Sequence, residues 1–422
     1  MNVPVNYLIL DERKRKDFNK LTISGYKKAD IFKALFNALS NRKIEEACYW
    51  TVELHCSGHL DQWWKKLLIY HSEHIHINCP YLPQWIWKTH EKYIQLEENF
   101  DPKYVHETRN NQEIRNLISD VIMIFVLASK SEPFKKKDLP PVSPLDFNKA
   151  RLIERIIAKN SYMICNILDQ GDPREIQLGL NEFAIHLNTE MSNFNDTIYW
   201  IQWLLMYELE CKNNNIPIPC KGIVIGDVDQ KWYNDWIWYC WKIILKEVDY
   251  RNNDPLQKQI YSLYKIYKIG FNSTTRKVKI AHIYHSVYML KNSVNWNIPL
   301  IKEYHLRVQA CGNINQLYKS VAVDSKTGVN EGNAGKLLEI REKCKGKIGK
   351  KKQKLKEKEK EERLLDEKTK YLRHIPKKSV VHIGSKEVEE RKKTLMDYLK
   401  KDDGDGDGGG GGGDIFAKSI SL

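Results

Sequence analysis

The sequence has no apolar run long enough to cross a membrane. Its longest one, Val121–Ala128, has eight residues, whereas a transmembrane helix needs about 20. The N-terminus also lacks the apolar core of a signal peptide, because Asp11 and Arg13 follow only a short apolar patch. We therefore expect a soluble intracellular protein with no membrane partner.

Recognisable catalytic motifs are equally scarce. The chain contains no glycine-rich phosphate-binding loop, no G-x-S-x-G motif and no H-E-x-x-H motif. Glu45, Glu46 and Glu53 would put carboxylates on consecutive helical turns, but Glu pairs on a Lys-rich surface are usually solvated helix formers. Gly222–Asp229 indicates a short strand and an acidic turn, as in some metal-dependent nucleases, without partner carboxylates at a recognisable spacing. We expect a non-enzymatic protein without a cofactor and keep an unrecognised nucleic-acid enzyme as the least favoured alternative.

Paired cysteine spacings are missing too. The nine cysteines are an odd, widely spaced set, which argues for a reducing compartment and against a disulfide scaffold. One window is nevertheless dense in potential zinc ligands, namely His55, Cys56, His59, His71, His74, His76 and Cys79. Its three-residue spacings are compatible with zinc, but no established finger spacing completes them. Core packing and helix-end roles are therefore favoured over a metal site.

Helical periodicity is what the sequence has in abundance. Apolar residues recur at three- and four-residue intervals in many segments between about residues 20 and 310. The segments are Asp30–Ser40, Ile44–Leu54, Trp63–Tyr70, Trp85–Asn99, Asn111–Ala128, Ala150–Leu168, Asp172–Asn188, Thr197–Cys211, Asp229–Glu247, Pro255–Ile269 and Val278–Lys291. This pattern predicts an all-α fold, a helical bundle of stacked helical hairpins.

Composition divides the chain into segments. A Pro- and Lys-rich stretch at residues 129–144 indicates a linker. The predicted organisation is an N-terminal lead (1–20), two helical subdomains (21–128 and 145–310), a Lys/Glu-rich arm (336–400) and a Gly-rich flexible tail (401–422). Tyr49-Trp50 and Tyr199-Trp200 occupy similar places in the two subdomains, which suggests a duplicated hairpin unit or a chance likeness.

The positive charge is concentrated in the arm. Of the net charge of +14, residues 336–400 carry +11, from 23 basic and 12 acidic residues, and the tail carries −3, which leaves +6 for residues 1–335. Clustered lysines bind nucleic acid without base preference, because they release counterions from the phosphates. The predicted contacts are Lys345, Lys347, Lys350, Lys351, Lys352, Lys354 and Lys356. An ordinary charged helix is the competing interpretation, and the run Arg13–Lys16 is expected to be plain solvated surface.

Two further segments have alternative interpretations. The Trp-rich stretches Tyr199–Trp203 and Trp232–Trp241 offer stacking surfaces for single-stranded nucleic acid, but their spacing fits a packed helix face better. Asp414–Leu422 follows a polyglycine spacer, which is how a tethered docking peptide reaches a viral or host partner protein. A tail without function is the alternative.

The stretch from residue 25 to residue 76 contains Gly25–Lys28, Lys43–Trp50 and Ile75. Through these and the motif positions below, it resembles an uncharacterised family of nucleocytoplasmic large DNA viruses. The motif positions, expected to be structural, are Tyr49, Trp50, Glu53, Gly58, His59, Trp64, His74 and His76. The resemblance implies a viral protein located in a cytoplasmic viral factory, the nucleus or the virion.

A second resemblance depends on residues in the order Ala47, Tyr49-Trp50, Gly58, Ser72-Glu73, Ile75 and Pro80. This order is similar, over about sixty residues, to the helical C-terminal collar of clamp-loader-related ATPases that act at stalled replication forks. That similarity implies an oligomerising helical region, and no ATPase activity is carried over because the phosphate-binding loop is missing. Our first hypothesis is a non-enzymatic scaffold or interaction protein of viral DNA replication or repair. The second is an internal virion or capsid-assembly component.

Overall fold

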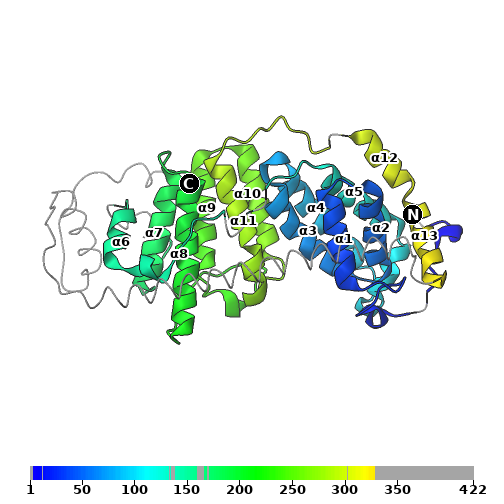
Figure 1. The fold of residues 1–422 in the computed structure, drawn as a ribbon, viewed down its shortest axis with the longest axis horizontal. Helices are drawn as coiled ribbons and strands as arrows, with labels where there is room; N and C mark the ends of the chain where they lie inside the picture. The colour runs from blue at the N-terminus through cyan, green and yellow to red at the C-terminus, as the bar shows by residue number, and fades with distance from the viewer. Residues whose placement is uncertain are drawn as a thin grey trace, which may run out of the picture. The chain divides into compact units, whose positions relative to one another are not determined.

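The computed structural model describes residues 3–327, except residues 12, 133, 135–137, 159–165, 169–170 and 302. These residues form α-helices and short 3-10 helices, and no β-strand occurs among them (Figure 1). The all-α prediction is therefore confirmed for this part of the chain. The predicted arm and tail lie outside it. None of the helices described is both long and apolar enough to cross a membrane.

The chain folds into two compact units that interleave along the sequence. The described residues of unit 1 come from 3–65, 89–128 and 301–327, and those of unit 2 from 66–88 and 129–300. The chain passes from one unit to the other inside helix α3 (Leu60–His74) and returns inside α4 (Leu82–Glu97). The division predicted from composition was contiguous and kept residues 66–88 with the first subdomain.

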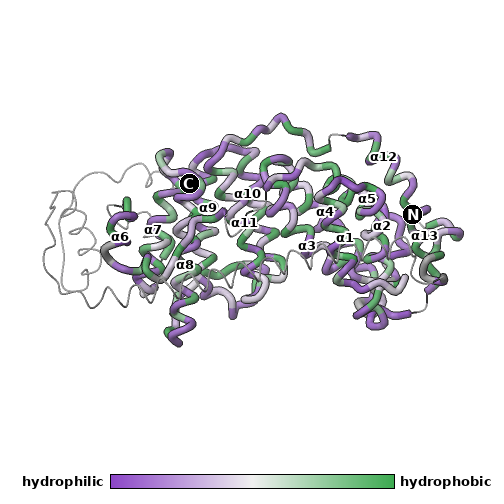
Figure 2. The backbone as a smooth tube through the Cα atoms, viewed as in Figure 1, coloured by the Kyte–Doolittle hydropathy of each residue, from purple (hydrophilic) through white to green (hydrophobic). Residues whose placement is uncertain are grey.

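Unit 1 is built around the helical hairpin α1 (Lys28–Ser40) and α2 (Ile44–Cys56), with α5 (Gln112–Leu127) packed against α2. Helix α5 is buried almost all round, and Ile118, Val121 and Phe125 have no more than 1% of their surface exposed. The remaining elements are η1 (Val5–Tyr7), η2 (Arg15–Phe18), η4 (Pro102–Asn110), α12 (Tyr304–Gly312) and α13 (Ile314–Thr327). In Figure 2 hydrophobic and hydrophilic residues alternate along single helices, as helices with one buried face require.

Helix α13 was not predicted, because the helical body was expected to end near residue 310. It packs on α2 and α5 through Tyr318, which is fully buried. The Tyr318 hydroxyl bonds to His55 Nδ1, and the guanidinium of Arg115 lies 3.8 Å from the centre of the Tyr318 ring. The last described helix of the chain thus completes the core of unit 1.

Unit 2 has the hairpin α7 (Arg174–Asn188) and α8 (Phe194–Asn213) beside α9 (Ile237–Arg251), α10 (Asp254–Lys268) and α11 (Ser273–Lys291) (Figure 1). Its short elements are η3 (His76–Asn78), η5 (Pro144–Phe147), α6 (Lys149–Arg155) and η7 (Gln230–Trp232). The Tyr-Trp pairs of α2 and α8 both meet edge to face, with ring centres 5.0 and 5.3 Å apart. The two hairpins therefore place these pairs alike.

Three predictions for unit 2 were wrong in their bounds or type. Helix α9 begins at Ile237, not Asp229, because Asp235 accepts the N–H of Ile237 at 3.0 Å. Helix α6 ends at Arg155, and residues 156–158 continue without helical structure. The strand indicated for Gly222–Asp229 does not form, and this stretch is irregular with a turn at its end.

Candidate functional site

The C-terminal turn of α2 holds the N-terminal loop of unit 1. Glu53 is fully buried, and its carboxylate accepts hydrogen bonds from the backbone N–H and the hydroxyl of Ser24, at 3.0 and 2.8 Å. Ser57 Oγ accepts the N–H of Ile23 at 2.9 Å and donates to the Glu53 carbonyl at 2.8 Å. A carboxylate in such a position supplies charge-assisted hydrogen bonds to a loop that would otherwise bury unpaired donors.

Gly58 and His59 continue this set of contacts. Gly58 has φ of +68°, the left-handed conformation that favours glycine just after a helix. His59 Nε2 lies 2.9 Å from the carbonyl of Phe18, and because a carbonyl only accepts, Nε2 carries the proton. Burial lowers the pKa of His59, although this hydrogen bond opposes the shift. We call Glu53, Ser57, Gly58 and His59 the α2 clamp.

The loop that the α2 clamp holds is strongly basic, and we call residues 13–28 the basic loop. Leu21 and Lys27 form an isolated β-bridge, and the Lys28 N–H donates to the Lys20 carbonyl at 3.3 Å. Arg13 Nη2 also donates to the Ile23 carbonyl at 2.9 Å, which ties the run at residues 13–16 to the same loop. The basic residues of the loop are Arg13, Lys14, Arg15, Lys16, Lys20, Lys27 and Lys28.

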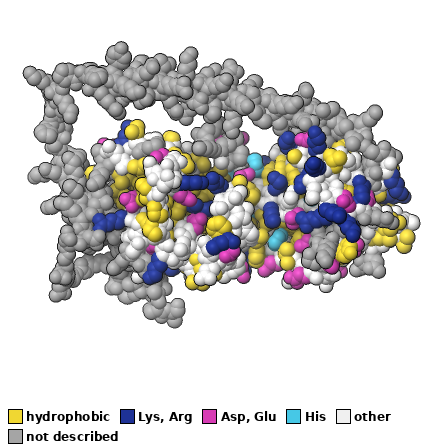
Figure 3. Space-filling view, turned by 90° about the horizontal axis from the view of Figure 1, so that it is seen from below, with side chains coloured by type: hydrophobic (Ala, Val, Ile, Leu, Met, Phe, Trp, Pro, Cys, Tyr) yellow, Lys and Arg dark blue, Asp and Glu magenta, His cyan; other side chains and the backbone are white. Residues whose placement is uncertain are grey.

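Four lysines of the basic loop are available to a partner. Arg13 pairs with Asp11 and Arg15 pairs with Asp61. The exposed lysines, which have no carboxylate partner within the described part of the chain, are Lys14, Lys16, Lys20 and Lys27. On the face drawn in Figure 3, exposed Lys and Arg side chains lie at several places. Sequence reasoning missed this cluster, because the contacts that shape it, the bridge of Leu21 with Lys27 and the bond from Arg13 to Ile23, form only in the folded loop.

The aromatic motif residues are part of the core of unit 1. Trp50 is 1% exposed and meets the rings of Tyr26 and Tyr49 edge to face, at 5.6 and 5.0 Å between centres. Trp64 is equally buried and contacts the rings of His90 and Tyr93. Tyr26 belongs to the basic loop and follows the segment held by Glu53. Trp50 therefore supports the basic loop through its contact with the Tyr26 ring.

His55 and Cys56 are also packing residues. Nδ1 of His55 bonds to the Tyr318 hydroxyl, and Nε2 lies 3.1 Å from Oγ1 of Thr108, so both ring nitrogens are occupied. Burial lowers the pKa of His55 well below its usual value, and the charge of Arg115 adds to the shift. Burial raises the pKa of the Cys56 thiol to about 12, so this cysteine stays a thiol at neutral pH.

In unit 2, His71 belongs to a buried group that we call the histidine cluster: His71, Ser72, His282 and His285. Ser72 Oγ lies 2.7 Å from Nδ1 of His282, 3.2 Å from Nδ1 of His285 and 3.3 Å from Nε2 of His71. The second ring nitrogens of His282 and His285 are buried, and no described residue forms a hydrogen bond with them. Burial lowers the pKa of His71 to about 3 and holds the pKa values of His282 and His285 well below 6.5.

His74 and His76 lie at the end of α3 and just beyond it. The His74 ring stacks on Tyr70 at 4.4 Å. His76 has φ of +43° and stacks on Phe134 at 4.1 Å, and its Nε2 donates to the Glu73 carbonyl at 2.6 Å. Burial lowers the pKa of His76 to about 4, against the effect of that hydrogen bond. Cys79 is buried, with Sγ 3.9 Å from the carbonyl of Leu300.

The seven potential zinc ligands are therefore spread over different surroundings. His55, Cys56 and His59 belong to unit 1, and the other four belong to unit 2. Among the residues with described positions, no three or more His, Cys, Asp or Glu side chains are arranged to hold a metal ion. Each of these histidines has a packing or hydrogen-bonding role instead.

The other sequence-based candidates lie in the core or outside the described residues. Trp203, Trp236, Trp238 and Trp241 are at most 3% exposed and pack in the core, and Trp232 is half-buried. Lys345–Lys356 and Asp414–Leu422 fall outside the described residues, and their binding roles stay predictions.

Replacing Glu53 by alanine should destabilise unit 1 by about 1–3 kcal/mol, because the buried N–H of Ser24 loses its partner. The exposed Glu45 lies on the same helix, and we expect less than about 1 kcal/mol for Glu45→Ala. Denaturant unfolding gives both values, and hydrogen exchange should speed up in residues 22–26 of Glu53→Ala alone. Equal exchange rates in the two variants would mean that the α2 clamp does not hold the loop.

No family model, no curated protein and no solved structure matches this chain.

Proposed function

We propose that this chain is a helical scaffold protein that contacts the phosphate backbone of nucleic acid through the basic loop and the Lys-rich residues 336–400. The observation that carries the proposal is the basic loop itself, in which Lys14, Lys16, Lys20 and Lys27 are exposed on a segment fixed by buried hydrogen bonds. A backbone segment that is already held in place loses little conformational entropy on binding, and each phosphate contact of a lysine releases a counterion. Such contacts carry no base preference.

The resemblance of residues 25–76 to proteins of large DNA viruses supports viral DNA replication or repair as the setting. In this proposal the protein acts in the viral factory or the nucleus and serves as a non-enzymatic interaction partner, with Asp414–Leu422 as a candidate docking segment. An internal virion component would use the same basic loop against the packaged genome. Abundance in purified particles favours the virion component, and co-purification with replication proteins favours the scaffold.

Neutralising the basic loop should weaken DNA binding and flatten its salt dependence. For the variant with Lys14, Lys16, Lys20 and Lys27 changed to Gln, the slope of log affinity against log salt should fall by about 2–4, since each phosphate contact contributes about 0.9. Fluorescence anisotropy of the full chain with random-sequence duplex DNA, from 50 to 200 mM salt, measures this slope.

The matched control carries four Lys→Gln changes at exposed lysines of unit 2, namely Lys212, Lys231, Lys258 and Lys277. The control has the same net charge as the loop variant, so an equal loss of binding in both would attribute the effect to bulk charge and contradict the proposal. Removal of residues 336–422 should lower the slope further. The proposal would also be contradicted if neither the deletion of residues 336–422 nor the loop variant changed the slope of log affinity against log salt.

A further inference from the structure

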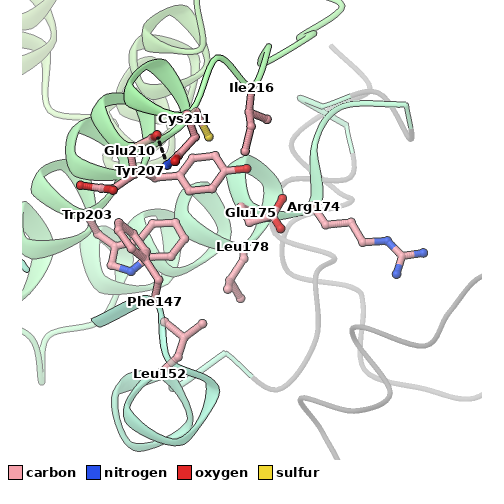
Figure 4. Close-up of a pocket in the computed structure, with 11 residues that line it drawn as sticks. Phe147, Leu152, Arg174, Glu175, Leu178, Trp203, Tyr207, Glu210, Cys211 and Ile216 are labelled. Atoms are coloured by element: carbon pink, nitrogen blue, oxygen red, sulfur yellow. Dashed lines mark hydrogen bonds between the residues drawn. The ribbon is translucent and has the colours of Figure 1, made fainter. Parts of the chain in front are cut away.

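Unit 2 contains a pocket that the nucleic-acid proposal does not use. It has a volume of about 290 Å³ and lies between α7, α8 and the segment from η5 to α6 (Figure 4). Phe147, Leu152 and Leu178 contribute apolar side chains, and Trp203 and Tyr207 contribute two rings from consecutive turns of α8. The volume is slightly below the ~300–1,000 Å³ of pockets for drug-sized molecules, so a single small head group is the size of ligand that fits.

Three aromatic rings line the pocket, and one of them is set at an angle to the other two. Trp203 and Tyr207 are parallel, with 2° between planes and 5.7 Å between centres. Phe147 stands across both, at 69° to Trp203 and 70° to Tyr207, with centres 5.1 and 6.0 Å away. Trp203 is 1% exposed and supports the other two rings from within the core. Phe147 and Tyr207 are partly exposed and line the pocket, and a cation that lies over the face of such a ring is attracted to it.

The charged groups around the pocket favour a cation as well. Glu175 and Glu210 are among the lining residues, against one arginine, Arg174. Figure 4 shows the Arg174 guanidinium pointing away from the rings, while the Glu175 carboxylate lies on the side of the Tyr207 hydroxyl. Burial, followed by hydrogen bonds to Cys211 and Glu175, raises the pKa of Tyr207. The Tyr207 hydroxyl therefore stays protonated, and Glu175 is the negative group next to the ring.

We propose that this pocket binds an alkylated ammonium group, with the alkyl surface against Phe147 and Tyr207 and the charge beside Glu175. A primary ammonium has three N–H donors to satisfy, and the lining is mainly apolar. A quaternary ammonium has no donors, so it loses no hydrogen bonds on entering and keeps its attraction to the rings and the carboxylate. The group has two chemical sources, a small quaternary amine or a trimethylated lysine side chain of a protein.

Choline should bind the full-length protein saturably in the millimolar range, and its neutral isostere 3,3-dimethylbutan-1-ol should bind at least about tenfold more weakly. Isothermal titration and ligand-observed NMR measure both affinities. Tyr207→Leu should weaken choline binding at least about tenfold, and Glu175→Gln about three- to tenfold, because the exposed Glu175 is replaced without loss of packing. Tyr304→Leu, at a tyrosine 63% exposed in α12, is the control and should bind as the parent protein does.

Peptides distinguish the two sources. A trimethyllysine peptide that binds at least tenfold more tightly than choline, with the unmodified peptide inactive, supports a protein side chain as ligand, and equal affinities support a small amine. Equal binding of choline and its neutral isostere would overturn the proposal, since the pocket would then be merely apolar. Absence of saturable binding, or unchanged binding in both Glu175→Gln and Tyr207→Leu, would overturn it too. Neither result bears on DNA binding, which is measured separately.

Discussion

Acidification from pH 7 to pH 5 should destabilise unit 2 by several kcal/mol, because the histidine cluster is buried in its neutral form. Burial lowers the pKa of His71 to about 3 and puts the pKa values of His282 and His285 well below 6.5. The unfolded chain takes up protons near pH 6.5, whereas the folded chain does not. Stability from these groups is therefore fully present above about pH 6.5 and is lost as the pH falls, by about 1.4 kcal/mol per pH unit for each histidine.

At pH 5 each of the three histidines contributes about 2 kcal/mol less to the free energy of unfolding than above pH 6.5, and together they contribute about 6 kcal/mol less. Glu182 has the opposite effect on the pH dependence of stability. Burial raises its pKa to about 7, although hydrogen bonds from the N–H groups of Ile157 and Ala158 lower it. Its carboxylate therefore costs stability at neutral pH, and acid relieves about 2 kcal/mol of that cost. The histidines outweigh it, and His76 adds to their effect.

Urea unfolding at pH 7, 6 and 5, followed by tryptophan fluorescence, measures this dependence. His285→Leu removes one protonation site, so its slope of stability against pH should be lower by about 1.4 kcal/mol per pH unit. The slope measures the difference in bound protons between the unfolded and the folded chain, so it is informative even if the variant is less stable at every pH. His305→Gln, at an exposed histidine of α12, should keep the parent slope. A parental slope in His285→Leu would show that His285 does not titrate as its burial requires.

The helices were predictable where one apolar stripe repeats without interruption. Asn111–Ala128 was predicted as a helix and α5 spans Gln112–Leu127, with the Asn111 side chain accepting the N–H of Ile114 at 3.0 Å. Helix α13 was missed although Ile314, Tyr318 and Val321 follow helical spacing, because three apolar positions among Lys and Ser carry a weak signal. Its burial depends on α2 and α5, which only the folded chain supplies.

The α2 clamp was predictable in its residues and not in its arrangement, and the lysines of the basic loop were not predicted as a site. Glu53 and His59 were identified as motif residues, but the bond from Ser24 to Glu53 spans 29 positions. His71 was grouped with the potential zinc ligands nearby in the sequence, whereas the structure places it in the histidine cluster. Its neighbour Ser72 contacts His282, which is 210 positions away in the sequence. Such contacts depend on how helices pack, and helical periodicity in a single sequence specifies buried faces without naming their partners.

Replacing Arg276 by methionine should destabilise unit 2 by about 3 kcal/mol, because the carboxylate of Asp235, which is 14% exposed, would lose its counterion in the interior. Glu208 would lose the same counterion, but its side chain is 37% exposed and adds less. Arg276 Nη1 donates to Glu208 Oε1 at 2.7 Å, and Nε lies 3.2 Å from Asp235 Oδ2. Its guanidinium also lies 4.8 Å from the centre of the Trp236 ring, whose N–H donates to Glu208 at 3.1 Å. Burial lowers the pKa of Arg276, but Asp235 and Glu208 outweigh burial and raise it overall.

The control is Arg307→Met, which breaks a geometrically similar pair at the surface of unit 1. Arg307 binds both oxygens of Asp120, at 2.9 and 2.8 Å, but both side chains are partly exposed. Water replaces much of that interaction, so we expect Arg307→Met to destabilise the protein by about 1 kcal/mol or less. Urea unfolding of the two variants measures both losses of stability. The triple variant Arg276→Met, Glu208→Gln, Asp235→Asn removes the two negative charges as well. If the triple variant is no more stable than Arg276→Met alone, the unpaired carboxylates do not cause the destabilisation. The cause is then the lost packing of the guanidinium against Trp236.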